Sequence, residues 1–187
     1  LDEALAAQWR ALTAPRNALQ LGTRTIRLDQ PQVMGIVNAT PDSFSDGGRF
    51  AGPAEAAAAG ARMSEEGAAI VDVGGESTRP GSKPVWEGDE VGRIEPVVRQ
   101  LASGGVAVSA DTRKADVMTA ALAAGAGMIN DVSALSYDER AATVVAAAGV
   151  PVVLMHHKGD PATMQDNPRY DDVVVEVYLW LEERVAA

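Results

Sequence analysis

The sequence contains no cysteine and few aromatic residues, with two Phe, three Trp and three Tyr among 187 residues. Without cysteine the chain forms neither disulfides nor thiolate metal sites, so we expect a reducing, cytoplasmic location. No apolar run reaches the length that a membrane-spanning helix needs. The formal net charge of −10 disfavours nucleic acids and anionic membranes. We therefore predict no nucleic-acid and no membrane partner, although a locally positive pocket can still bind an anionic substrate.

Several short catalytic motifs are also missing. The sequence has no GxSxG, no HExxH and no P-loop, which counts against the usual hydrolases, zinc proteases and nucleoside-triphosphate enzymes. It has no GxGxxG after the apolar stretch that ends at Val37, where a dinucleotide-binding fold carries that motif.

Short apolar runs alternate with helical segments five times from residue 33 onward. The predicted buried strands are residues 33–38, 69–73, 106–110, 127–130 and 150–155, and the predicted helices are residues 53–67, 87–101, 114–124, 138–148 and 170–187. Residues 1–12 predict an amphipathic helix, and residues 19–28 a small β-hairpin. The chain is thus predicted to be one domain, with residues 1–30 forming a helix and hairpin and residues 31–187 forming five βα units.

Buried strands that alternate with helices indicate a parallel sheet, either a doubly wound sheet or a barrel. Polar residues favour the barrel, because one stands at or near the carboxyl end of each successive strand. A barrel gathers all such ends in one ring, where its active sites lie. We therefore predict an α/β fold, a (β/α)8 TIM barrel of which this chain supplies about the first five βα units. The ring residues are Asn38, Asp72, Asp111, Asn130 and His156.

Each of these residues also has a purely structural interpretation. Asp72 could belong to a buried ion pair, and Asp111 could cap the helix predicted to begin near Lys114. Asn130 with Asp131 could form a turn and a cap. Of His156 and its neighbour, at most one is expected to enter a site, because adjacent side chains point in different directions. Their recurrence at one topological position in five units favours a shared site over five separate structural uses.

The residue types indicate which ligands such a ring could bind. Carboxylate and carboxamide groups at Asp111 and Asn130 can pair with the amidine-like edge of a nitrogen heterocycle. Asn38 with Thr40 and Ser43 offers oxygen ligands suited to Mg²⁺, which usually keeps waters and substrate phosphates. Two long loops rich in glycine, proline and small polar residues could close over an aromatic second substrate; they carry Phe44, Thr78, Arg79 and Pro80.

Five motifs, in this order and spacing, resemble those of dihydropteroate synthases: VMGIVNATPDSFSDGG, VDVGGESTRPG, DTRK, INDVSA and VVLMHHKGDPATMQ. The resemblance implies a folate-pathway transferase that condenses 6-hydroxymethyl-7,8-dihydropterin pyrophosphate with p-aminobenzoate to give 7,8-dihydropteroate and pyrophosphate. It also implies that sulfonamides inhibit the enzyme, and that the full-length protein is a homodimer.

The resemblance also implies roles for individual residues. Asn38 would bind Mg²⁺ and pyrophosphate, and it would be catalytic together with Asp72 and Asp111. The pterin would contact Asp72, Asp111, Asn130 and Met155, and the p-aminobenzoate pocket would include Phe44, Thr78, Arg79 and Pro80. In this family pyrophosphate leaves first, and the arylamine then attacks the pterin methylene cation. The alternatives are a methyltetrahydrofolate-type pterin methyltransferase and a catalytically dead pterin-binding fragment.

We expect the chain to be incomplete. Five units are too few for a closed barrel, which needs eight in ~250 residues. The family's later motifs, a DPG aspartate, an SRK lysine and an RVHD arginine and histidine, do not occur in the sequence. If the protein ended at Ala187, we would expect no synthase turnover.

Overall fold

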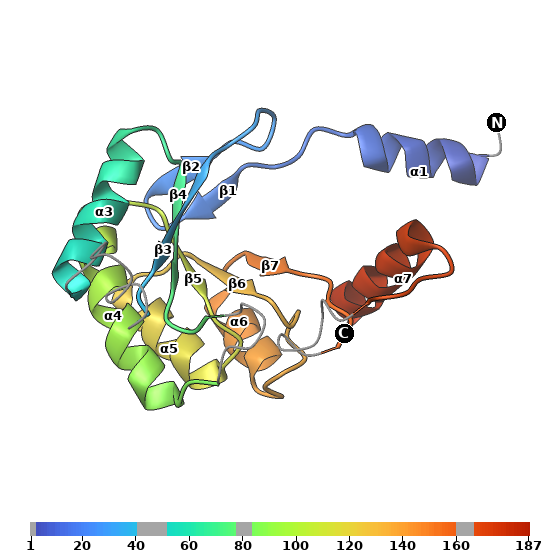
Figure 1. Ribbon diagram of the computed structural model, residues 1–187. Coiled ribbons are helices and arrows are strands. Elements are labelled where there is room, and N and C mark those ends of the chain that lie inside the picture. The colour runs from blue at the N-terminus through green and yellow to red at the C-terminus, as the bar shows by residue number, and fades with distance from the viewer. Residues whose placement is uncertain (1–2, 41–51, 78–83, 160–166) are drawn as a thin grey trace.

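The computed structural model describes residues 3–40, 52–77, 84–159 and 167–187. Five strands form one parallel sheet in chain order (Figure 1). This order is that of a barrel wall, whereas a doubly wound sheet reverses its strand order at a switch point. The strands are β3 (Met34–Asn38), β4 (Ile70–Gly74), β5 (Val108–Asp111), β6 (Met128–Asp131) and β7 (Val152–Leu154).

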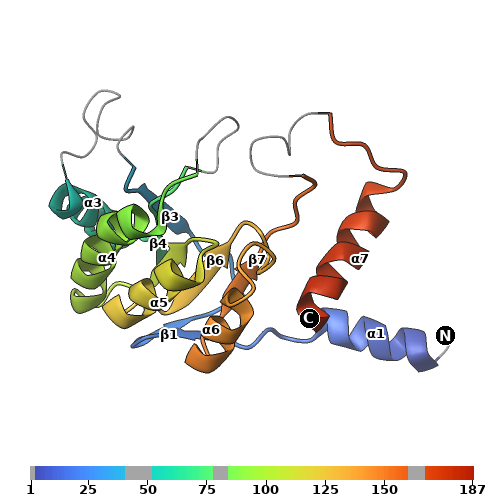
Figure 2. The ribbon, with the colours of Figure 1, turned by 90° about the horizontal axis from the view of Figure 1, so that it is seen from below.

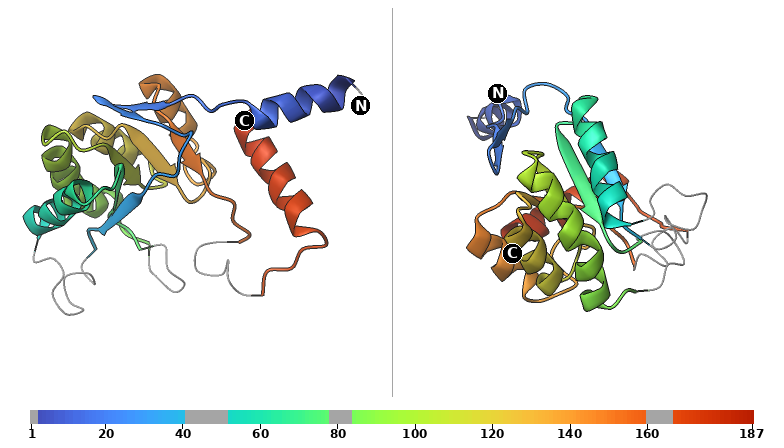
Figure 3. Two further views of the ribbon diagram at one scale, coloured as in Figure 1. Left: turned by 90° about the horizontal axis from the view of Figure 1, so that it is seen from above. Right: turned by 90° about the vertical axis from the view of Figure 1, so that its left-hand side faces the viewer.

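Four helices cover one face of this sheet: α3 (Pro53–Glu65), α4 (Glu87–Ser103), α5 (Ala115–Ala124) and α6 (Ala141–Ala148). The right-hand view of Figure 3 shows helices of this layer in front of the strands. Alternate strand residues, among them Val37, Val71, Val73 and Ile129, join helix residues in one buried apolar cluster. Because side chains alternate along a strand, the residues between them lie on the opposite face, which holds the polar residues of interest.

Helix α3 packs closely against the rest of the core at Gly60. A Cβ atom added there would lie 3.0 Å from Leu101 Cδ1 and 3.1 Å from Val71 Cγ1. Gly60→Val is therefore expected to lower the free energy of unfolding by about 1–3 kcal/mol through overpacking. Ala58→Val, at an exposed position of the same helix, is the matched control and should cost about 0.5 kcal/mol or less. Equal urea midpoints for the two variants would show that this contact is not tight.

The strands β1 (Leu19–Leu21) and β2 (Arg24–Ile26) form an antiparallel hairpin, as the sequence predicted. Leu21 and Ile26 pack with Ile70, Ala107 and Met128, at or just before the first residues of β4, β5 and β6. The hairpin thus covers the amino-terminal end of the sheet. A ligand site on this sheet therefore lies at the opposite, carboxyl end.

Two helices stand apart from this layer, α1 (Glu3–Thr13) and α7 (Val173–Ala186), as Figure 2 shows. Asp172 caps α7, since its side chain accepts hydrogen bonds from the amides of Val174 and Val175. The guanidinium of Arg184 joins α7 to the loop after β6, where it donates to the carbonyl of Ala134 over 2.9 Å. No helix within the described ranges combines the length and the apolar character that crossing a membrane requires.

The prediction of a fully buried first strand was wrong for β3. Val37 is buried under the helices, but Ile36 on the opposite face is 60% exposed. The physical reason is position, because β3 is an edge strand of the described sheet and only its helix-facing side is covered. The other edge strand, β7, similarly leaves Val153 exposed. An apolar run thus identified the strand but not how many of its faces are covered.

Candidate functional site at the carboxyl ends of the strands

The strand register brings the predicted site residues into one row across the sheet. Asn38 is paired with Gly74, Gly74 with Asp111, and Asp111 with Asn130. Register partners in a parallel sheet present their side chains to the same face. Gly74 leaves space in this row, since a Cβ there would lie 3.3 Å from Asp111 Oδ2. A larger residue at this position would push against the Asp111 carboxylate.

Asp72 lies one layer below this row, on the same face, and is 4% exposed. Asn130 Nδ2 donates a hydrogen bond of 2.9 Å to Asp72 Oδ2, so the two predicted pterin contacts do meet. Among the described residues, Asp72 Oδ1 and the Oγ of its register neighbour Ser109 make no well-aligned hydrogen bond, although the Ser109 hydroxyl is close enough to Asp72 to lower its pKa. A buried unsatisfied oxygen costs free energy. A ligand or water that donates to Asp72 Oδ1 would therefore satisfy this buried oxygen.

The two carboxylates of the cluster resist ionisation. Burial raises the pKa of Asp111 to about 7, and the negative charges of Asp72, Glu90, Asp131 and Glu76 add to the effect. Burial also raises the pKa of Asp72, although Ser109 and Asn130 counteract part of that rise. Within the described residues no side chain donates a hydrogen bond to Asp111. The cluster is therefore suited to a ligand that brings N–H donors or positive charge.

The structural interpretations of these residues can now be judged. The capping interpretation of Asp111 was wrong, because Asp111 is the last residue of β5 and the amide of Ala115, the first residue of α5, donates to Asp138 Oδ2 over 3.0 Å. The turn interpretation was right for Asp131, whose carboxylate accepts from the amides of Ser133 (2.7 Å) and Leu135 (2.9 Å). Asn130 instead points its amide at Asp72.

The remaining predicted residues lie away from this cluster or outside the described part of the chain. Asn38 is exposed at the far end of the row, and Met155 is 37% exposed just after β7. His156 does not join the ring as predicted: its imidazole lies edge-on to Trp180, with ring centroids 5.0 Å apart. This ring contact explains the correction, because it turns His156 toward α7. Ser43, Phe44, Thr78, Arg79 and Pro80 lie outside the described residues.

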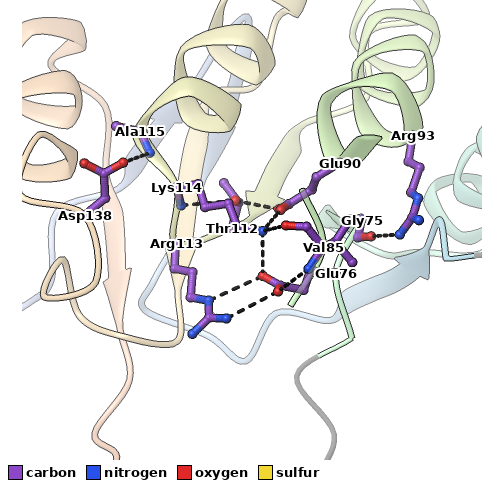
Figure 4. A network of polar contacts seen from close by, with 10 residues as sticks. All are labelled: Gly75, Glu76, Val85, Glu90, Arg93, Thr112, Arg113, Lys114, Ala115 and Asp138. Carbon is purple, nitrogen blue, oxygen red and sulfur yellow. Dashed lines mark hydrogen bonds and ion pairs between the residues drawn. The ribbon is translucent and has the colours of Figure 1, made fainter. Parts of the chain in front are cut away.

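Sequence analysis missed a buried ionic network beside the site (Figure 4). Lys114 Nζ contacts Glu90 Oε2 at 2.5 Å, Glu76 Oε2 at 3.0 Å and the carbonyl oxygen of Val85 at 2.8 Å. Arg113 pairs with Glu76 at 3.3 Å. The side chains of Glu90, Glu76 and Lys114 are 0–7% exposed. Two acids and two bases thus neutralise one another in the interior.

Glu76 is held ionised by this network. Burial would raise its pKa, but hydrogen bonds from Arg113, Lys114 and the Val85 amide outweigh that effect and lower the pKa below its ordinary value. The signal that could have identified the network was the charge density of the two motifs, with Glu76 in GGESTRPG and Arg113–Lys114 in DTRK. Which charges pair could not be inferred, since the partners are far apart in the chain.

The described residues offer few ligands for the Mg²⁺ ion that the sequence predicted. Within the described ranges, no three His, Asp or Glu side chains are grouped to hold a metal ion. Asn38, exposed at the end of β3, could contribute a carboxamide oxygen, whereas Thr40 is buried at 7% exposure. A single protein oxygen is compatible with Mg²⁺, which often keeps waters and substrate phosphates as its other ligands.

A parallel sheet in chain order, covered by a hairpin at one end and bearing buried carboxylates at the other, defines a barrel-type ligand site. The chain belongs to the family described as pterin binding enzyme, whose pattern matches residues 34–187. This match covers every strand of the five-stranded sheet. It also covers the site residues Asn38, Asp72, Asp111 and Asn130.

Dihydropteroate synthases are among the relatives that this chain matches. The chain is 49% identical over 174 residues to the dihydropteroate synthase of Neisseria meningitidis serogroup B, covering 91% of this chain and 61% of that protein. A Yersinia pestis dihydropteroate synthase crystallised in complex with a sulfonamide drug superposes with a TM-score of 0.84 at 43% identity, covering 90% of this chain and 62% of that one. A Xanthomonas albilineans dihydropteroate synthase with 4-aminobenzoic acid gives 0.81 at 51% identity, covering 90% and 59%.

These coverages have one direct consequence. The chain spans about three fifths of the relatives it matches, and the matched part includes the five-stranded sheet. The predicted α/β fold with barrel topology is confirmed for this part.

Proposed function

We propose that this chain carries the pterin site of a dihydropteroate synthase, a transferase that joins 6-hydroxymethyl-7,8-dihydropterin pyrophosphate to p-aminobenzoate. The observation that carries the proposal is the buried cluster of Asp72, Asn130 and Asp111, which offers hydrogen-bond acceptors without a neutralising cation in the described structure. Membership of the pterin binding family and the names of the relatives support it.

The chemistry of a pterin matches this cluster. Its 2-amino group and adjacent ring nitrogen present N–H donors side by side, and a carboxylate accepts two such donors at once. Asp111 supplies that carboxylate at the end of β5, and Asp72 Oδ1 accepts a further donor. Asn130 is oriented by its bond to Asp72, which leaves its carboxamide oxygen for the ligand. Each residue thus accepts from the heterocycle, and none needs a basic partner.

The same carboxylates suit the proposed reaction. The C–O bond between the pterin methylene and the pyrophosphate breaks first, and its electron pair leaves with the pyrophosphate. The amine nitrogen of p-aminobenzoate then attacks the methylene cation and loses a proton to solvent. The N–H donors of the bound pterin favour the ionised form of these carboxylates, and their negative charge stabilises the cation as it forms. Asp72 and Asp111 would supply this charge.

Asn38 is proposed as the one described protein ligand for Mg²⁺. When bound, the ion would offset the negative charge of the departing pyrophosphate. Asn38 is exposed and lies at the carboxyl end of the strands, in the same row as Asp111, which supports this assignment.

The p-aminobenzoate pocket is proposed from Phe44, Thr78, Arg79 and Pro80, which lie outside the described residues. Support comes from the relatives, since the Xanthomonas albilineans protein was crystallised with 4-aminobenzoic acid and the Yersinia pestis protein in complex with a sulfonamide drug. The homodimer expected from the resemblance stays a prediction.

Asp111→Ala tests the pterin assignment. Loss of one charge-assisted hydrogen bond of about 1.5–3 kcal/mol should weaken binding of the pterin pyrophosphate roughly 10- to 150-fold in isothermal titration calorimetry. Asp116→Ala is the matched control, because Asp116 is an exposed carboxylate five residues away that pairs with Arg140. Unchanged affinity in the Asp111 variant would refute the assignment.

Pyrophosphate release separates the proposed synthase from its alternatives. A pterin methyltransferase or an inactive binding fragment would bind pterin through the same residues but would release no pyrophosphate on addition of p-aminobenzoate. Steady-state release that requires both substrates would establish the synthase.

A further inference from the structure

We propose that Lys114, together with Glu76 and Glu90, is a positioning residue that ties both ends of the segment between β4 and α4 to the pterin site. The inference rests on the proposed function, which assigns Thr78 and Pro80 of that segment to the arylamine. It adds a role for three charged residues that do not themselves touch either substrate. The arylamine KM, rather than pterin affinity, should therefore depend on Lys114.

The first support is the way in which Val85 is held. Its amide donates to Glu76 Oε1 over 3.1 Å, and its carbonyl accepts from Lys114 Nζ over 2.8 Å. Both polar groups of one backbone residue are thus bound by side chains of the same network (Figure 4). Glu76 lies two residues after the end of β4, and Val85 lies two residues before the start of α4. The network therefore brings together two points of the chain that are nine residues apart.

The second support is the link from the network to Asp111. Thr112, the next residue, donates through Oγ1 to Glu90 Oε1 over 2.7 Å, and its amide donates to the Asn130 carbonyl over 3.0 Å. Glu90 is fully buried on α4 and also accepts from Lys114. The end of β5, the start of α4 and both ends of the segment are therefore held by one connected set of bonds. Displacement of one part would break bonds to the others.

The third support is that general stability does not account for this arrangement. Buried ion pairs are often no more stabilising than well-packed apolar residues of the same size. Glu76 follows β4, Lys114 precedes α5 and Glu90 lies in the first turn of α4, so all three charges lie at the ends of elements. Arg113, which pairs with Glu76, also lies over the ring of Tyr137, with Cζ 4.0 Å from its centroid. The charges thus bridge loops at the site rather than fill the core.

The test removes the contacts of Lys114 without leaving an unpaired charge in the buried network. In the double variant Lys114→Met with Glu90→Gln, one cation and one anion are lost together, and the glutamine oxygen can still accept from Thr112. This variant should therefore unfold cooperatively with a midpoint near that of the wild type. Arg99→Met is the matched control, because Arg99 is an exposed cation on α4 that pairs only with Glu95 within the described structure.

Two readouts follow in the double variant. Hydrogen exchange of the Val85 amide should accelerate roughly tenfold or more, because its carbonyl anchor is gone. The KM for p-aminobenzoate should rise roughly tenfold or more, while the Kd of the pterin pyrophosphate changes less than about twofold. In Arg99→Met, the exchange rate of the Val85 amide and the KM for p-aminobenzoate should both stay at the wild-type values. A merely structural role would instead lower the unfolding midpoint and change the binding of both substrates together.

The experiment distinguishes a failure of the Lys114 inference from a failure of the proposed synthase function. If the wild type binds no pterin, the proposed function fails, but Val85 exchange still decides whether Lys114 anchors this backbone. Unchanged exchange in the double variant would overturn the inference. Faster exchange with an unchanged KM for p-aminobenzoate would overturn the role in arylamine binding, while the synthase assignment would stand.

Discussion

Glu90→Ala is expected to lower the free energy of unfolding by about 3–5 kcal/mol. Glu90 is 0% exposed, and its two oxygens accept from Thr112 Oγ1 (2.7 Å) and Lys114 Nζ (2.5 Å). Without it, the buried hydroxyl has no acceptor and the network carries two cations against the single carboxylate of Glu76. A substitution that leaves a buried charge unpaired belongs to the few kinds of substitution that lower the free energy of unfolding by so much.

Urea denaturation at neutral pH measures this loss. Glu95→Ala is the control on the same helix, since its partner Arg99 is 60% exposed and an exposed pair contributes about 0–1 kcal/mol. The double variant in which Lys114 is also replaced should recover much of the stability, because the unpaired cation is then absent. If Glu90→Ala were no more destabilising than Glu95→Ala, the network would not be held as described.

Asp111→Asn is expected to stabilise the folded protein at pH 8 but not at pH 4. Burial and neighbouring negative charge raise the pKa of Asp111 from its ordinary value of 3.8 to about 7. Between these values the folded state holds a proton that the unfolded chain has released, so the stability of the wild type falls as the pH rises. Above about pH 7 the whole penalty is present, and asparagine removes it. The gain is roughly 1–4 kcal/mol.

Thermal or urea unfolding of both proteins across this pH range provides the measurement. The difference between them should be near zero at pH 4, grow up to about pH 7 and then level off. The same variant should bind the pterin pyrophosphate more weakly, because a carboxamide accepts fewer of its donors. Higher stability together with weaker binding is the pattern of a site strained for function. A difference independent of pH would show that Asp111 is not the titrating group.

Local sequence patterns sufficed for the elements of the fold. Each predicted strand and helix is present, with ends displaced by a few residues: the helix predicted over residues 138–148, for example, begins at Ala141. Apolar periodicity and breakers such as Gly125 and Gly149, which end α5 and α6 in the left-handed conformation, are properties of neighbouring residues. They can therefore be recognised without knowledge of distant contacts.

The polar cluster was predictable only in part. The placement of Asp72, Asp111 and Asn130 together followed from topology, because parallel strands in chain order bring equivalent ends together. The individual bonds did not follow. Whether Asp111 caps a helix or ends a strand depends on where α5 begins, and Asp138, more than 20 residues away, decides that by accepting from Ala115. Burial of Ile36 likewise depends on neighbours that a strand pattern does not reveal.

The ionic network was beyond sequence reasoning for a related reason. Lys114 pairs with Glu90 and Glu76, which are 24 and 38 positions away in the chain. Nothing in the motifs shows which acidic residue each basic residue pairs with. The choice follows from the mutual placement of α4, β5 and the end of β4. Charge density can indicate such a network, but only the packed structure shows its pairing.

The order of strands in the sheet also bears on how the protein acquires its structure. Within the described five-stranded sheet, each strand pairs only with its neighbours in chain order, so successive partners begin within about 40 residues of each other. The contact order is consequently low for a parallel sheet, and each βα unit can add to the preceding one as the chain leaves the ribosome. Asp111 and Asn130 would then meet before β7 is made, whereas the Arg184 contact to the loop after β6 would form only once α7 has been made.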